Sequence, residues 1–254
     1  MPLLGHEGHI DMVSTLQKLA ASIAKPTAII VVSAHWETPG IFVNTQKHPE
    51  LLYDYYGFPE QAYAIEYPVL GEPQLAQLVI DALNNLDVPV VAETHRGIDH
   101  GVFVPLAIMY PSADIPCVQV SLHQNYDPQL HIEVGKRIGK AISHLDNVLV
   151  LGSGFSFHNM KAFWQPNDPE ANKMNGEFEA WLAEVLTATK NEQEREGQLV
   201  NWLEAPGARY CHPTEEHLLP LHVAYGAAQS SLTTIEQVSV IGKLATFALW
   251  AMPN

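Results

Sequence analysis

Positive charge is scarce in this chain of 254 residues. Lysine and arginine together number 13, against 28 aspartates and glutamates, so the formal net charge is −15. A surface that holds nucleic acid, or one attracted to an anionic membrane, needs the opposite sign. The composition therefore argues against a nucleic-acid partner and against a membrane partner recruited by charge.

Cysteine and long apolar runs are also scarce. The two cysteines, Cys117 and Cys211, form no CxxC pair and no disulfide framework. No apolar run reaches the roughly 18 residues that span a bilayer, and the first residues lack the basic and apolar regions of a signal peptide. We therefore expect a cytoplasmic protein. Its hydrophobic content of 47% is enough for a full core.

No repeat, low-complexity tract or linker divides the chain, so we expect a single domain over residues 1–254. Short apolar runs alternate with segments in which apolar residues recur at helical spacing. The runs predict strands over 27–34, 88–92, 116–122 and 147–151, and the spacing predicts helices over 8–24, 71–86, 128–142, around 178–185 and over 217–228. Residues 235–241 and 244–251 predict a hairpin around Gly242-Lys243. This order predicts an α/β fold with a mostly parallel, mixed central sheet, helices on both faces, and the hairpin as its antiparallel part.

Histidine is abundant, with 13 residues, as many as lysine and arginine together. His35, His123 and His158 each come at or just after the end of a predicted strand. In open α/β sheets, ligands bind outside the carboxyl ends of the strands, so this placement predicts a site. His100, in a loop bracketed by glycines, and His217, at the start of a predicted helix, are further candidates.

Several neutral imidazoles that converge on a cleft can bind a divalent transition metal, and others nearby can transfer protons near neutral pH. Aromatic side chains of the loops could line a pocket for a flat apolar substrate, although ordinary core packing explains most of them individually: Trp36, Tyr53, Tyr55, Tyr56, Phe58, Phe155 and Phe157. The remaining central histidines are interpreted as surface residues (His48, His95, His131 and His144) or stay undecided (His212 and His222).

Other motifs are weak. Gly152-Ser153-Gly154 follows a predicted strand, but the third glycine of a dinucleotide loop is absent because residue 157 is Phe. Ser153 is also not part of a G-x-S-x-G nucleophile motif. Neither a nucleotide site nor a serine hydrolase is therefore indicated.

Five motifs occur in order along the chain: Ser33–Glu37, Asp54–Pro59, Ile98–Leu106, Leu151–Asn159 and Glu216–Leu221. Together they resemble the class III extradiol ring-cleavage dioxygenases of the LigB type, in the branch related to 4,5-DOPA extradiol dioxygenase. Each motif alone is modest, but five in the same order are specific. The resemblance extends from the first residues to the C-terminus.

The resemblance implies an oxidoreductase of aromatic compound metabolism that cleaves a small aromatic diol beside its two hydroxyls and inserts both atoms of O2. It implies a non-haem metal, Fe(II) for activity with Zn(II) as the alternative. On this resemblance His35 and His217 are metal ligands, His158 is the catalytic base and His100 is the second acid–base residue. His123 has no family role and is expected near the pocket. The identity of the catechol, the cleavage position and the oligomeric state stay open, and an oligomer is compatible with the sequence.

One departure from the family is expected to matter. The family carries its first metal ligand in a segment like Ser-His-Gly-Gly-Gly-Pro, directly before the residues that match Pro2–Gly5. The chain starts inside that segment, so the LigB-type domain is expected to lack its first strand. The ligand then lies in an upstream segment, or His6 or His9 replaces it. Two alternative functions are kept: a non-catalytic relative that acts as a binding module, and a zinc-dependent hydrolase.

Overall fold

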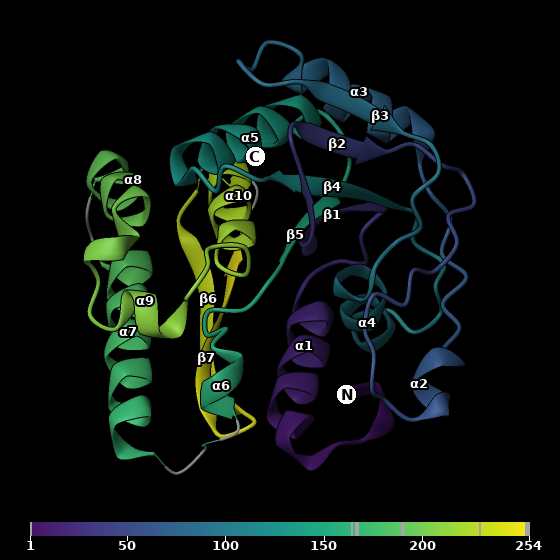
Figure 1. Ribbon diagram of the computed structural model, residues 1–254. Helices are drawn as coiled ribbons and strands as arrows, with labels where there is room; N and C mark the ends of the chain where they lie inside the picture. Colours follow the sequence, from purple (N-terminus) through teal and green to yellow (C-terminus); the bar gives the residue numbers. More distant parts are fainter. Residues whose placement is uncertain (1, 164, 166–167, 189–190, 229, 252–254) are drawn as a thin grey trace.

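The computed structural model describes residues 2–163, 165, 168–188, 191–228 and 230–251 (Figure 1). The strands are β1 (Ala28–Thr38), β2 (Ile41–Asn44), β3 (Val90–Glu93), β4 (Cys117–His123), β5 (Val148–Ser153), β6 (Leu232–Val240) and β7 (Lys243–Trp250). The α-helices are α1 (Ile10–Ser22), α2 (Glu60–Tyr63), α3 (Pro73–Leu83), α4 (His100–Met109), α5 (Pro128–Ile142), α6 (Met160–Phe163), α7 (Pro169–Thr187), α8 (Glu192–Val200), α9 (Ala208–Cys211) and α10 (Leu219–Ala228), with short 3-10 turns at Pro2–Leu4, Glu7–His9 and Trp202–Glu204. Across these described parts, no helix is both long enough and apolar enough to cross a membrane.

Five strands form the central sheet in the order β3-β2-β4-β1-β5. β1 pairs in parallel with β4 and β5, β2 pairs in parallel with β3, and only the β2–β4 contact, at Val43 and Val120, is antiparallel. This confirms the predicted α/β fold with a mostly parallel, mixed sheet. The antiparallel element is β2, however, a four-residue strand too short to be predicted from its pattern. The β6–β7 hairpin forms a separate two-stranded sheet, so assigning it to the central sheet was wrong.

β1 lies inside the sheet and is buried on both faces. Ile30 and Val32 belong to the core cluster shared with α3, α5 and α10, whereas Ile29 and Val31 belong to the cluster shared with α1 and α4. This alternation follows from the two-residue period of a strand. Figure 1 shows α3 and α5 on one side of the sheet and α1 and α4 on the other. Full burial of each such side chain contributes about 1.5–3 kcal/mol.

The segment around His100 is a helix rather than the predicted loop, because His100 is the first residue of α4. Val102, Phe103 and Leu106 are fully buried, and buried residues lie on every side of this helix. A helix buried all round has no polar face and therefore no apolar periodicity to detect. Pro105 lies inside the helix, and a proline at such a position also argues against predicting a helix.

Two element boundaries also differ from the expectation. β1 continues to Thr38, and its register with β4 shifts between Val32 and Glu37, so His35 lies in an irregular stretch within the strand rather than after it. The β6–β7 turn is at Ile241-Gly242, where both residues have positive φ, 51° and 77°. Two such residues are typical of a type I′ hairpin turn.

Glycines let α10 approach α5 closely. A Cβ at Gly226 would lie 2.2 Å from the carbonyl oxygen of Ile132, and one at Gly135 would lie 2.1 Å from that of Val223. No L side chain fits there without displacing backbone. This close packing fixes α10, and with it the position of His217 just before the helix.

Candidate active site

A cavity of about 840 Å³ is bounded by α1, β5, α10 and β7. Consecutive residues 148–153 of β5 and 246–250 of β7 line it, together with apolar side chains of α1 and α10. Four of the predicted histidines, His35, His100, His158 and His217, face the same cavity. The space is therefore mainly apolar, with imidazoles as its chemically active groups.

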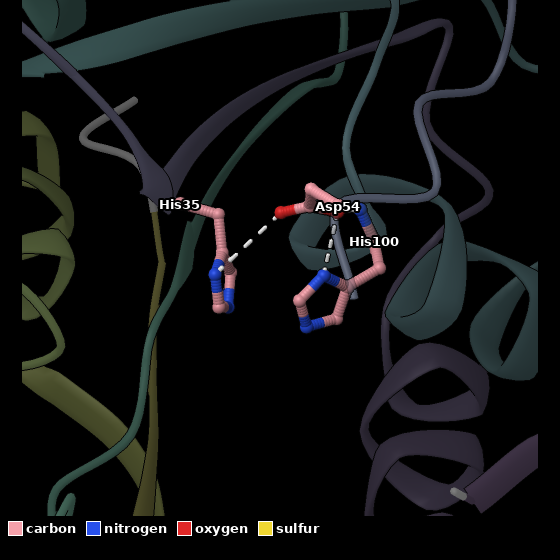
Figure 2. A group of neighbouring side chains, drawn as sticks. All are labelled: His35, Asp54 and His100. Carbon is pink, nitrogen blue, oxygen red and sulfur yellow. Dashed lines mark hydrogen bonds and ion pairs between the residues drawn. The ribbon is translucent and has the colours of Figure 1, made fainter. Parts of the chain in front are cut away.

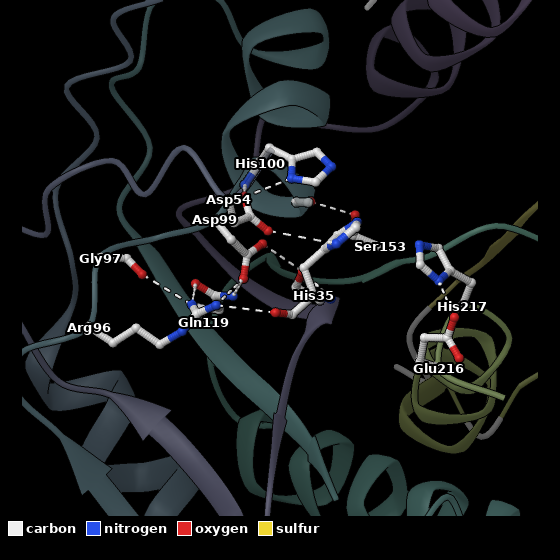
Figure 3. Close-up of polar contacts among 12 residues, drawn as sticks. His35, Asp54, Arg96, Gly97, Asp99, His100, Gln119, Ser153, Glu216 and His217 are labelled. Atoms are coloured by element: carbon white, nitrogen blue, oxygen red, sulfur yellow. Dashed lines mark hydrogen bonds and ion pairs between the residues drawn. The ribbon is translucent and has the colours of Figure 1, made fainter. Parts of the chain in front are cut away.

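The four imidazoles form a continuous cluster. The ring centroids of His35 and His100 are 4.0 Å apart, and those of His35 and His217 are 5.0 Å apart with the rings nearly perpendicular. His158 stacks on His217 at 3.3 Å with an interplanar angle of 12°. Residues from β1, α4, the segment after β5 and the segment before α10 thus meet in one place. Figure 3 shows three of them, His35, His100 and His217.

A buried polar network holds the backbone of β1 at His35. Ser33 Oγ donates to Asp99 Oδ1 at 2.7 Å and accepts the backbone N–H of His35 at 3.2 Å. Asp99 is fully buried, and it pairs with Arg96 at 3.0 Å and accepts a hydrogen bond from Gln119. Arg96 also donates to the carbonyl oxygen of His35 at 3.2 Å. These contacts provide hydrogen-bond partners for the backbone N–H and carbonyl oxygen of His35, where regular pairing with β4 is interrupted. Figure 3 shows the contacts of Arg96 and Asp99 in this network.

Two glycines allow backbone segments to meet around the imidazoles. A Cβ at Gly101 would lie 2.3 Å from Ser33 Oγ and 3.0 Å from His35 Cδ2. A Cβ at Gly154 would lie 2.2 Å from the carbonyl oxygen of His217, which accepts the N–H of Phe155 at 2.8 Å. The Gly152-Ser153-Gly154 motif thus serves close contact with the His217 segment.

Asp54 faces two of the histidines from the loop that follows β2. Its Oδ1 accepts the backbone N–H of His100 at 3.0 Å and lies 2.7 Å from His100 Nδ1, while Oδ2 lies 3.7 Å from His35 Nδ1 (Figure 2). Burial acts to raise the pKa of Asp54, but the hydrogen bonds from His100 outweigh it and lower that pKa. Asp54 is therefore an ionised acceptor at neutral pH.

Glu216 occupies the equivalent position on the other side. Its Oε1 lies 3.3 Å from His158 Nδ1 and 3.1 Å from His217 Nδ1. Burial opposes ionisation, but hydrogen bonds, those with His158 and His217 first, hold the pKa of Glu216 well below its usual range.

The two predicted metal ligands are neutral at physiological pH. Burial lowers the pKa of His35 to about 4, with the neighbouring His100 adding to the effect, and burial lowers the pKa of His217 to about 3. A metal ligand must be the neutral imidazole. His35 and His217 are therefore in the protonation state that metal binding requires.

His6 and His9 line the same cavity from the N-terminal segment. Their ring centroids lie 5.2 Å apart, and His6 Nδ1 accepts the N–H of Gly8 at 3.2 Å. His9 Nδ1 is buried without a hydrogen-bond partner, and burial lowers the pKa of His9 to about 4. Both therefore offer imidazoles to the cavity.

Comparison with known proteins identifies the family. The model of the catalytic LigB subunit of aromatic ring-opening dioxygenase matches residues 6–249. The chain belongs to this family.

Individual relatives agree with the family match. The dioxygenase tasH of Hapsidospora irregularis is 36% identical over 247 residues, covering 90% of this chain and 74% of its own length. The 4,5-DOPA dioxygenase extradiol of Mirabilis jalapa is 33% identical over 235 residues, covering 89% and 83%. A crystal structure of an uncharacterised Escherichia coli K12 protein superposes with a TM-score of 0.72 at 30% identity, covering 92% of this chain and 91% of that one.

As a LigB family member, the protein is a non-haem, metal-dependent extradiol dioxygenase, an oxidoreductase that opens an aromatic ring with O2. This confirms the expected dioxygenase, and nothing favours the binding module or the zinc-dependent hydrolase. The residues present fit a divalent transition metal, because two neutral imidazoles lie with ring centroids 5.0 Å apart beside the cavity and His217 Nδ1 is already engaged by Glu216. Its other ring nitrogen is free for a ligand bond.

The structure brings His35, His100, His158 and His217 together, and His123 is not part of this cluster. His123 instead uses its Nδ1 to accept the N–H of Asn125. His131, which was wrongly interpreted as a surface residue, is fully buried. Its Nε2 accepts the N–H of His123 at 3.1 Å, and its Nδ1 lies 2.6 Å from the carbonyl oxygen of Asp127, so it ties β4 to α5.

His212 and His222 are also buried, structural residues. His212 Nε2 donates to the carbonyl oxygen of Ser156 at 2.7 Å, and His222 contacts the carbonyl oxygens of Leu218 and Leu199. The aromatic candidates divide in a similar way. Those lining the cavity are Tyr55, Phe58 and Phe155, whereas Trp36 and Phe157 are buried, Tyr53 packs against the core, and Tyr56 is 92% exposed.

Sequence reasoning missed the carboxylates of the site. Asp54 and Glu216 each begin one of the five motifs, and Glu216 directly precedes a predicted ligand, but the sequence pattern predicted no role for either. Asp99 precedes His100 in the same way. An acidic residue next to a predicted active-site histidine is the signal that could have identified Glu216 and Asp99.

Proposed function

We propose that His35 and His217 hold the metal of this dioxygenase, with His158 as the catalytic base and His100 as the second acid–base residue. Fe(II) is the metal proposed for activity, with Zn(II) as the alternative, and the substrate is a catechol. One observation carries the proposal: two neutral imidazoles with ring centroids 5.0 Å apart are flanked by His100 on one side and by His158 on the other. Such a pair is suited to a metal, and the flanking rings to proton transfer.

When bound, the metal supplies the redox chemistry toward O2 and lowers the pKa of a hydroxyl that binds it. The protein's own groups handle the protons and the surroundings. His158, whose Nδ1 is engaged by Glu216, takes a hydroxyl proton at its other ring nitrogen. His100, held by Asp54, holds a proton for a later transfer. Aromatic residues beside the histidines exclude water from the reacting ring: Tyr55, whose ring centroid lies 5.3 Å from that of His100, and Phe155, whose N–H donates to the carbonyl oxygen of His217.

The proposal is tested by loading the protein with Fe(II) under argon and then adding catechol and O2. We expect catechol-dependent O2 uptake and a yellow ring-fission product. His158→Ala is expected to keep catechol binding and to lose about 10²–10⁴-fold in turnover, because a general base acts on the chemical step. Unchanged turnover with a raised KM would instead assign His158 to substrate recognition.

We further propose that the single domain is completed by an additional strand in the cavity beside β5. Among the described residues, β5 pairs with β1 on one edge, and β7 pairs with β6. Six consecutive residues of β5 and five of β7 line the cavity, and we call the space beside them a slot for a strand of about six residues, or roughly 20 Å. α1 and α10 would cover its two faces, as they cover neighbouring strands.

A strand in this slot would reach the histidine cluster and could carry a third imidazole ligand. The alternative is that His6 or His9 supplies it. Metal content of the 254-residue chain is to be compared with that of a version extended upstream. Tighter Fe(II) binding by the extended version supports the additional strand, because three facial ligands hold a divalent ion better than two. Equal occupancy and equal O2 uptake would contradict it and favour His6 or His9.

A further inference from the structure

The four imidazoles of the proposed site are arranged as two matched pairs, each facing one carboxylate. Asp54 faces the Nδ1 atoms of His100 and His35, and Glu216 faces the Nδ1 atoms of His158 and His217. Each pair contains one proposed metal ligand and one proposed proton-transfer residue. The two carboxylates come from distant segments, the loop after β2 and the turn before α10.

The contacts with Glu216 have one consequence for the imidazoles. A single oxygen, Oε1, forms a hydrogen bond with His217 Nδ1 at 3.1 Å and lies 3.3 Å from Nδ1 of His158, the ring stacked on His217. A carboxylate accepts hydrogen bonds and donates none, so each Nδ1 that faces it must carry the hydrogen. In a neutral imidazole, the lone pair is then on Nε2.

Asp54 acts in the same way on His100, with its Oδ1 at 2.7 Å from Nδ1. Figure 2 shows the second ring nitrogen of His100 pointing away from Asp54, and that of His35 pointing the same way. His35 Nδ1 is 3.7 Å from Oδ2, which is ion-pair distance rather than hydrogen-bond distance. The tautomer of His100 is therefore set more firmly than that of His35.

We infer that Asp54 and Glu216 are positioning residues that hold His100, His158 and His217 in the Nδ1–H tautomer and so leave each Nε2 lone pair for a proton or a metal ion. This inference rests on the proposed function for its purpose, but the tautomers themselves do not depend on it. Carboxylates in this position also fix ring orientation and raise the basicity of a ligating imidazole.

A purely structural role is the competing explanation, and for Asp54 it is specific. Asp54 Oδ1 also accepts the N–H of His100 at the first residue of α4, which Asp99 does not cap with its side chain. Asparagine serves such a capping position about as well as aspartate. In Asp54→Asn the same Oδ1 can make both contacts, so this variant keeps the cap and the Nδ1–H form, whereas Asp54→Ala removes the acceptor and no longer selects one tautomer.

The test is 15N NMR of the imidazoles in metal-free protein labelled at histidine. We expect Nδ1–H signals for His100, His158 and His217 in the unmodified chain. Asp54→Ala should introduce the Nε2–H form at His100 alone, while Asp54→Asn, which keeps both contacts, should not. Glu216→Gln should introduce the Nε2–H form at His158 and His217 alone. Glu215→Gln is the matched control, because the Glu215 carboxylate pairs with Arg209 at 2.6 Å instead of an imidazole.

A second readout is affinity for Zn(II) alone, measured by competition with a chelator. Glu216→Gln should weaken it by about 10- to 100-fold, the usual cost of losing the group that orients a ligating imidazole, with Glu215→Gln unchanged. Unaltered tautomers in both Asp54→Ala and Glu216→Gln would overturn the inference, as would Nε2–H signals in the unmodified chain. If the tautomers shift as expected but the unmodified chain binds no metal, the inference stands and the proposed function fails.

Discussion

Glu179, on α7, is a fully buried carboxyl group whose charge should make stability fall as the pH rises. Its Oε2 accepts a hydrogen bond from Thr246 on β7, while its Oε1 is buried without a partner. Burial raises the pKa of Glu179 from 4.5 to about 7, and hydrogen bonds from Thr246 and Ser156 offset only part of this effect. The folded protein therefore binds more protons than the unfolded chain between these pH values, and its free energy of unfolding falls as the pH rises through that window.

The size of the effect follows from the two pKa values. At 1.36 kcal/mol per pH unit, the difference corresponds to about 3 kcal/mol of stability lost by pH 8, of which the larger part, about 2.5 kcal/mol, is lost above pH 5. Glu179→Gln keeps the shape of the side chain and an acceptor for Thr246 but cannot ionise. Its stability relative to the unmodified chain should therefore rise by about 2.5 kcal/mol between pH 5 and pH 8.

Urea denaturation at the two pH values measures this difference directly. Glu177→Gln, at an exposed position of the same helix, is the matched control and should leave the pH dependence unchanged. Taking the difference between variants removes the contributions of the other titrating groups. If Glu179→Gln and the unmodified chain lose stability in parallel from pH 5 to pH 8, the carboxyl is not held protonated and the reasoning is refuted.

Three further outcomes are expected. His100→Phe should keep metal and catechol binding but slow turnover, because His100 acts in a proton transfer after the first one. Single-turnover kinetics should then show normal substrate deprotonation followed by delayed product formation. An unchanged rate of product formation would show that His100 has no part in the mechanism. Gly101→Ala should weaken metal binding and lower the melting temperature, because its Cβ would lie 2.3 Å from Ser33 Oγ in the network that holds His35. An unchanged metal affinity and melting temperature would show that this network can shift to accept the Cβ. As the pH falls from 6.5 to 4, the free energy of unfolding should decrease, because burial lowers the pKa of His131 and His212 to about 4 and the unfolded chain takes up these protons first. In acid denaturation, His131→Gln should make this decrease smaller. An unchanged decrease would show that His131 is not held neutral by burial.

Much of the fold could be predicted because its strands are unusually clear in the sequence. The run at 28–32 is buried on both faces of the sheet and shows as an uninterrupted apolar segment, and Asp127-Pro128 marks the start of α5, where the Asp127 side chain accepts the N–H of Gln129. α4 could not be predicted in the same way, because burial on all its sides removes the polar positions that reveal helical period.

The histidines of the site were found for a reason that also explains the errors. Four site histidines could be found from their positions at strand ends and in the motifs: His35, His100, His158 and His217. These positions do not show which imidazoles form hydrogen bonds with buried backbone groups. His131 was misassigned for that reason, since its Nε2 accepts the N–H of His123 on β4, a contact that exists only in the folded chain. The pairing of Asp54 with His100, 46 residues along the chain, likewise exists only once the loop after β2 lies against α4.

We propose that a metal ion binds between His35 and His217. Equilibrium dialysis against Fe(II) under argon, with the bound metal counted for the unmodified chain, His35→Ala, His217→Ala and His158→Ala, tests it most directly. Both ligand variants should lose the metal while circular dichroism shows an unchanged fold, and His158→Ala should retain the metal. Equal metal content in all four proteins, or loss only in His158→Ala, would contradict the claim.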